Sequence, residues 1–164
     1  MERHILSVLA LNHSGVLSKI SGLFSRRGYN IDCFSAGVTE DPKLSRMTIV
    51  VHTDPITLEQ IKNQLEKLID VIKVVELKEN EAVFRELVMI KIEATKENRA
   101  EILEIVNIFR AHIVDVGKNS LVVEITGDES KINALIGMLE GYGIKEITRT
   151  GLSAIMRGSQ ELKD

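Results

Sequence analysis

The stretch that decides the fold is Leu11-Asn12-His13-Ser14-Gly15-Val16, followed downstream by Arg27-Gly28-Tyr29-Asn30-Ile31. An apolar run over residues 5–11 enters this first polar loop, and apolar residues with a 3.6-residue period begin directly after it. We therefore expect a strand, a short turn and a helix over about residues 15–27, in that order.

The loop between this strand and this helix has the residue types of an anion-binding turn. Ser14 or Asn12 has a side-chain oxygen that can cap the helix by accepting from its first backbone N–H groups. Gly15 has no Cβ, so a ligand could approach those N–H groups closely, and the positive pole of a helix N-terminus favours a carboxylate or phosphate. The same residues also fit an ordinary capped turn with no ligand, and their spacing alone does not separate the two interpretations.

The hydrophobic periods along the chain repeat one order of elements twice. Residues 5–77 read as strand, helix, strand, strand, helix and strand, a charged break follows at 78–81, and residues 87–150 repeat the order. This is the ferredoxin-like split βαβ arrangement. We predict an α+β protein with two ferredoxin-like βαββαβ domains in tandem, over residues 1–79 and 84–164.

Capping residues predict where several helices begin and end. Asp54 followed by proline predicts a helix start, and Gly28 fits the left-handed position after a helix end. In the second half, Asp128 is expected to start a helix and Gly143 to stop it. The apolar tail at 151–158 is expected to pack on its own domain as a short helix, or to be a docking segment.

The composition excludes several classes of protein. The net charge of −3 and the 4% aromatic content argue against a nucleic-acid partner, and the apolar windows are too short to span a bilayer. The start of the chain enters a strand pattern at once, so no signal peptide is expected, and Cys33 is the single cysteine. We expect a cytoplasmic protein without a membrane or nucleic-acid partner.

Motifs for catalysis and metal binding are also missing. The sequence has no phosphate-loop lysine pattern, no Gly-x-Ser-x-Gly elbow and no His-Glu-x-x-His, and its four histidines lie on separate elements. A small enzyme on a ferredoxin-like scaffold would need titratable groups that converge in a cleft, which the sequence does not indicate. We therefore expect no catalytic site, no metal site and no cofactor on this chain.

Longer stretches resemble a known family. They are Leu6-Ser7-Val8, Asn12-His13-Ser14-Gly15-Val16-Leu17, Gly22-Leu23-Phe24-Ser25-Arg26-Arg27-Gly28-Tyr29-Asn30-Ile31, Arg85-Glu86-Leu87, Arg149-Thr150-Gly151 and Arg157-Gly158. The first half resembles an ACT domain. Together the stretches resemble the small regulatory subunit of acetolactate synthase, also called acetohydroxyacid synthase, over nearly the whole chain.

The resemblance implies a function without catalysis on this chain. It implies a partner, the large catalytic subunit, which carries thiamine diphosphate and Mg²⁺ and condenses 2-oxo acids in branched-chain amino acid biosynthesis. The small subunit activates this partner and transmits feedback inhibition, usually by valine. Because one methylene in an apolar pocket changes binding by only about 1–3 kcal/mol, the sequence does not separate valine from leucine or isoleucine.

The resemblance also implies an effector site at the interface of a homodimer formed through the ACT domains. The matching residues are Asn12, Gly15 and Val16 on the loop side and Asn30 and Ile31 on the partner side, with Leu17 as further apolar surface and His13 as lining only. Backbone N–H groups near Gly15 would hold the carboxylate of the amino acid, and the asparagine amides would suit its two charged ends. An alternative is a stand-alone amino-acid-sensing ACT module that regulates another enzyme or regulator and does not need the second half.

Overall fold

The computed structural model of the chain describes residues 1–162 and divides them into two compact units. The first unit contains residues 1–84 together with the C-terminal segment that begins at Leu152, and the second contains residues 85–151.

The first unit contains the predicted order of strands and helices. Its elements are β1 (Glu2–Leu11), α1 (Val16–Arg27), β2 (Cys33–Val38), β3 (Leu44–Thr53), α2 (Pro55–Glu66) and β4 (Val71–Glu76). The four strands form one sheet in the order β2-β3-β1-β4, and each neighbouring pair is antiparallel. β1 and β2 are both antiparallel to β3, so they run in the same direction.

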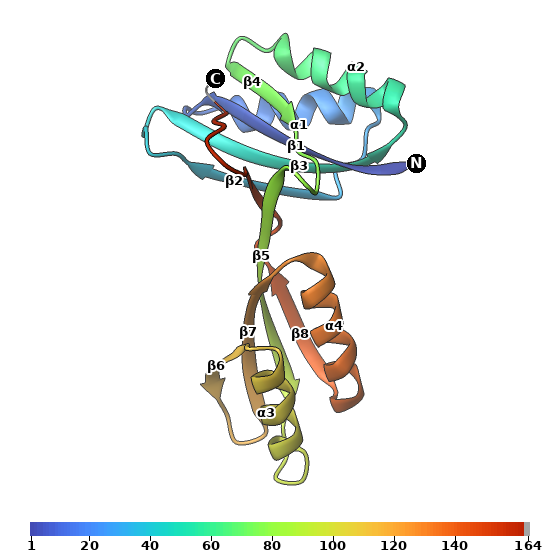
Figure 1. The fold of residues 1–164 in the computed structure, drawn as a ribbon, viewed down its shortest axis with the longest axis vertical. Helices are drawn as coiled ribbons and strands as arrows, with labels where there is room; N and C mark the ends of the chain where they lie inside the picture. The colour runs from blue at the N-terminus through green and yellow to red at the C-terminus, as the bar shows by residue number, and fades with distance from the viewer. Residues whose placement is uncertain (163–164) are drawn as a thin grey trace. The chain divides into compact units, whose positions relative to one another are not determined.

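Helices α1 and α2 cover one face of this sheet (Figure 1). The apolar stripe of α1 ends in Phe24, which is almost fully buried and packs with every second residue of β1 and β3. Such alternation is expected because successive side chains of a strand point to opposite faces. The inward-facing strand residues are Leu6, Val8, Ala10, Met47, Ile49 and Val51.

Most predicted helix ends are confirmed. The Asp54 carboxylate accepts hydrogen bonds from the backbone N–H groups of Ile56 and Thr57 at 3.0 Å, and Gly28 has a φ of 68°. In the second half, Asp128 caps a helix over Glu129–Leu139 by accepting from the Lys131 N–H, and Gly143, after the turn that follows this helix, has a φ of 87°.

The prediction that Ser14 or Asn12 caps α1 is wrong. Gly15 is the N-cap residue, and it has no side-chain oxygen to accept from the first turn. The Asn12 amide donates instead to the Pro42 carbonyl oxygen at 2.9 Å, because the loop lies against the turn between β2 and β3.

The second unit repeats the order of the first. Its elements are β5 (Ala82–Glu93, which begins in the first unit), α3 (Arg99–Ile108), β6 (His112–Val116), β7 (Ser120–Gly127), α4 (Glu129–Leu139), the 3-10 turn η1 (Glu140–Tyr142) and β8 (Ile144–Arg149). The strand order β6-β7-β5-β8 matches that of the first sheet, and α3 and α4 pack on one face of it. The α+β fold with two ferredoxin-like βαββαβ domains in tandem is therefore confirmed.

The C-terminal segment packs on the first unit and not, as the first of the two alternatives held, as a short helix on its own domain. Leu152 and Ala154 pack on the face of the first sheet that the helices leave open, against Ile5 and Val50. Residues Ser153–Met156 form strand β9, which pairs with β5. The tail is thus neither a short helix nor part of the second domain, because β1 and β3 present apolar side chains on both faces of the first sheet.

Hydrogen bonds to the backbone of this segment fix it in place. The Ser35 hydroxyl donates to the Leu152 carbonyl oxygen at 2.6 Å, and the Leu152 N–H donates to the Cys33 sulfur at 3.2 Å. Farther along, the Arg157 N–H donates to the Glu81 carbonyl oxygen at 2.8 Å. Residues 152–162 therefore form a strap across the open face of the first sheet, and we refer to them below as the C-terminal strap.

Candidate functional site

The loop between β1 and α1 keeps the N-terminus of α1 open. Gly15 has a φ of 90° and a ψ of −15°, and a Cβ placed on it would have no heavy atom within 4 Å. Val16 is buried in the core of the first unit, whereas the side chain of Leu17 is about half exposed. Because the first N–H groups of a helix have no intrahelical acceptor, this end of α1 can hold a carboxylate.

Asn12 fixes the other side of this loop. Its N–H donates to the Lys43 carbonyl oxygen at 2.7 Å, and its side-chain amide donates to the Pro42 carbonyl oxygen at 2.9 Å. The loop is thereby tied to the turn that joins β2 and β3.

The loop between β1 and α1 is also held by Asp70, a contact that was not predicted from the sequence. The Asp70 carboxylate lies 2.9 Å from Nε2 of His13 and 2.6 Å from Nζ of Lys19, and the Leu11 N–H donates to the Asp70 carbonyl oxygen at 2.8 Å. The hydrogen bond from Lys19 holds the pKa of the Asp70 carboxyl below its ordinary value, and the one from His13 acts in the same direction. Asp70 precedes β4 by one residue, so only the pairing of β4 with β1 reveals its position.

We expect Asp70→Asn to lower the melting temperature at pH 7, because it removes the charge that holds Lys19 and His13. The pKa of Asp70 is lowered in the folded chain, so its contribution is complete above the unfolded pKa of about 3.9 and is lost as the pH falls through the folded value. The difference between wild type and variant should therefore shrink below about pH 4. Melting curves from pH 7 to pH 2 test this, with the exposed Asp115→Asn as control. A constant difference across this range would contradict the assignment.

The residues predicted for the partner side lie just before β2. Asn30 is exposed and its amide donates to Asp32 at 2.7 Å, and the same Asp32 carboxylate lies 2.6 Å from Nδ1 of His52. Ile31 is partly buried against the core of the first unit.

One chain does not bring the two groups of predicted residues together. Asn12 bonds to Lys43 at one end of β3, whereas the Asp32 N–H bonds to Val50 near the other end. At about 3.3 Å per residue, Lys43 and Val50 are about 23 Å apart. Asn12, His13, Gly15, Val16 and Leu17 therefore lie together, and Asn30 and Ile31 lie at the opposite end of the sheet.

The corresponding loop of the second unit is closed. The guanidinium of Arg99 donates to the carbonyl oxygens of Ala94, Gly117 and Lys118 at 3.2, 3.0 and 2.9 Å. The Arg99 side chain thus ties this loop to the turn between β6 and β7, and no glycine stands at the start of α3.

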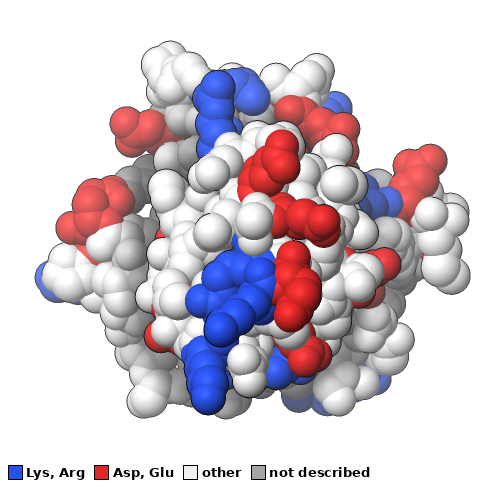
Figure 2. Space-filling view, turned by 90° about the horizontal axis from the view of Figure 1, so that it is seen from below, with Lys and Arg blue, Asp and Glu red and all other residues white. Residues whose placement is uncertain are grey.

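Other kinds of site find little support in the described residues. Within residues 1–162, no group of three or more His, Cys, Asp and Glu side chains is placed to hold a metal ion. No helix in that range is long and apolar enough to cross a membrane. On the face shown in Figure 2, Lys and Arg side chains lie beside Asp and Glu side chains rather than forming one continuous basic patch.

Both halves of the chain match known protein families. Residues 6–73 match the family model of the AHAS small subunit-like ACT domain, and residues 85–158 match that of the small subunit of acetolactate synthase. The probable acetolactate synthase small subunit of Archaeoglobus fulgidus is 50% identical over 159 residues, which are 97% of this chain and 99% of that protein. This chain belongs to the acetolactate synthase small-subunit family.

Further members of the family cover the chain equally well. The acetolactate synthase small subunit of Mycolicibacterium smegmatis is 50% identical over 94% of this chain and 91% of its own length, and that of Bacillus subtilis is 46% identical over 97% and 93%. The crystal structure of the small subunit from Thermotoga maritima has 40% sequence identity and a TM-score of 0.90, with 98% of this chain and 100% of that chain covered. The resemblance inferred from the sequence is thereby confirmed, and it includes the ACT domain in the first unit.

Proposed function

We propose that this chain is the regulatory subunit of acetolactate synthase, that it activates the large catalytic subunit, and that it transmits feedback inhibition by valine or a related branched-chain amino acid. The observation that carries this proposal is the match to acetolactate synthase small subunits along nearly the whole chain. Thiamine diphosphate and Mg²⁺ would then belong to the catalytic subunit. A stand-alone sensing module would not need the second unit, whereas the family match includes it.

The topology of the first sheet supports an effector site between two copies of the chain. β2 is an edge strand, and an edge presents N–H and C=O groups that can pair with another strand. β1 and β2 run in the same direction, so the Asn12 loop lies near the carboxyl end of β2 and Asn30 near its amino end. Antiparallel pairing of β2 with its copy would bring Asn30 of one chain beside the Asn12 loop of the other, and the predicted site would then be complete.

In this arrangement each side of the site has a distinct role. The N-terminus of α1 at Gly15 would bind the carboxylate of the effector, and the amides of Asn12 and Asn30 would bind its polar groups. The exposed part of Leu17 and the partly buried Ile31 would contact the branched side chain. An effector held by two chains favours one arrangement of the ACT domains, and such coupling is typically about 1–3 kcal/mol, or about 5–150-fold in affinity.

Calorimetric titration of the purified chain with valine, leucine and isoleucine tests the effector site. We expect saturable binding that Asn30→Ala weakens by about tenfold or more, because loss of a hydrogen bond to a charged group is worth about 1.5–3 kcal/mol. Asn80→Ala changes the same residue type in the exposed turn between β4 and β5, and it should leave binding unchanged. Equal binding by the wild type and Asn30→Ala would contradict the assignment of the partner side.

Reconstitution tests the wider function. Addition of the chain to a purified acetolactate synthase catalytic subunit should raise its activity and make that activity sensitive to the amino acid that binds best. Failure to raise the activity would contradict the proposal.

A further inference from the structure

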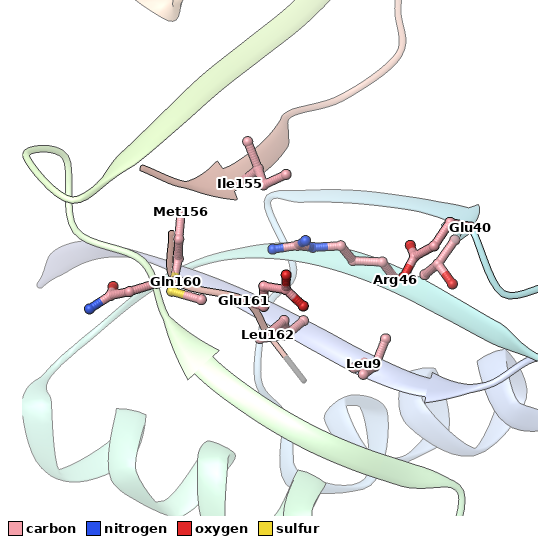
Figure 3. Close-up of a pocket in the computed structure, with 9 residues that line it drawn as sticks. Leu9, Glu40, Arg46, Ile155, Met156, Gln160, Glu161 and Leu162 are labelled. Atoms are coloured by element: carbon pink, nitrogen blue, oxygen red, sulfur yellow. The ribbon is translucent and has the colours of Figure 1, made fainter. Parts of the chain in front are cut away.

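A cavity of about 270 Å³ lies under the C-terminal strap, on the sheet face opposite α1 and α2 (Figure 3). The sheet side contributes Leu9 and Arg46, and the strap contributes Met156, Glu161 and Leu162. All of these residues belong to the first unit. Ligand pockets usually have about 300–1,000 Å³, so this volume suits a ligand smaller than most.

Arg46 is the cation of this cavity. Its Nε donates to the Ser7 hydroxyl at 3.1 Å, whereas its Nη2 is buried and has no hydrogen-bond partner among the described residues. Burial lowers the pKa of the Arg46 guanidinium, and the neighbouring Glu40 carboxylate opposes this effect. A buried charged donor without a partner is unfavourable, so the position of Arg46 calls for an acceptor within the cavity.

The other lining residues restrict the chemistry of that acceptor. Glu40 and Glu161 line the same cavity, and Figure 3 shows the Glu161 carboxylate turned into the space that the Arg46 side chain enters. Two carboxylates disfavour a multiply charged anion such as phosphate but favour a ligand that also has a positive group. Leu9, Met156 and Leu162 add apolar surface.

We propose that this cavity binds a small aliphatic α-amino acid. The ligand carboxylate accepts from Arg46, its ammonium group faces Glu161 and Glu40, and its side chain packs against Leu9 and Met156. Because the sheet and the strap each supply part of the lining, the bound amino acid fastens the strap to the sheet. The cavity is complete within one chain, so this site does not depend on the effector site proposed between two chains.

NMR of the full chain with ¹³C-labelled methionine methyl groups reports on this site directly. Met156 lines the cavity, and Met47 lies in the core on the helix-covered face and serves as an internal control. Titration with L-leucine should shift the Met156 signal saturably and leave the Met47 signal in place. The response should persist in Gly15→Asp, which alters only the loop at α1, so failure of one site is distinguishable from failure of the other. A Met156 signal that does not respond would overturn the proposal.

Variants and ligand analogues test the two charge contacts. Arg46→Gln should weaken the affinity for leucine, as measured from the Met156 signal, by about tenfold or more. Glu161 is exposed, so Glu161→Gln should leave the fold intact. This variant should weaken the binding of leucine but not the binding of its 2-oxo acid analogue, which lacks the ammonium group. Two results would contradict an amino acid site. One is equal affinity of the wild type and Glu161→Gln for leucine, and the other is equal affinity of the wild type for leucine and for inorganic phosphate.

Discussion

Gly15→Asp should abolish feedback inhibition of the reconstituted enzyme and leave activation of the catalytic subunit intact. The new carboxylate would stand at the N-terminus of α1, where the carboxylate of the effector is proposed to bind. There is room for it, since a Cβ on Gly15 meets no heavy atom within 4 Å. Two like charges about 4 Å apart repel by about 4 kcal/mol near a protein surface. The valine concentration for half inhibition should therefore rise by roughly several hundredfold, which in practice abolishes inhibition.

Gly15→Asn is the matched control for this variant. Asparagine has nearly the same size as aspartate and meets the same backbone conformation, a φ of 90°, but it has no charge. Both side chains tolerate positive φ better than most, so any backbone strain is shared. Inhibition curves with valine should therefore separate the two, with a response retained in Gly15→Asn. An unaltered valine response in Gly15→Asp would contradict the placement of the carboxylate.

The order of the elements could be predicted from the sequence because it depends on local signals. The 3.6-residue period after Gly15, the Asp54-Pro55 pair and Gly28 each act through neighbouring residues. The loop side of the candidate site was inferred from the family resemblance, and its residues 12–17 lie together because they are contiguous in the chain. Its partner side is a different case, because the distance between Asn12 and Asn30 depends on how strands pair within and between chains.

The contacts that the sequence did not predict are all between distant parts of the chain. Asp70 supports the loop only because β4 pairs with β1, and no spacing in the sequence relates it to His13. In the same way, an apolar tail predicts burial but not the surface that buries it. The first sheet has two apolar faces, and its two helices cover only one of them. The need for the tail to cover the other face becomes visible only when Ile5 and Val50 are placed on it.

Leu152→Asp should strongly destabilise the first unit, since it places a charge in the contact between the strap and the sheet. Leu152 is 5% exposed and packs in one cluster with Ile5 and Val50. Truncation of a buried leucine to alanine costs about 2–5 kcal/mol, and a buried charge without a partner adds to this loss. Domains are stable by only about 5–15 kcal/mol, so the effect is a large part of the total.

Ile155→Asp provides the matched control for this effect. Ile155 lies on the same strap, but it is 56% exposed because neighbouring residues of β9 point to opposite sides. Surface substitutions usually change the free energy of unfolding by less than about 0.5 kcal/mol. Urea unfolding should therefore show a clearly lower midpoint for Leu152→Asp and a nearly unchanged one for Ile155→Asp. Equal midpoints for the two variants would mean that the strap contributes little to the first unit, because of these two residues Leu152 is buried and Ile155 is exposed.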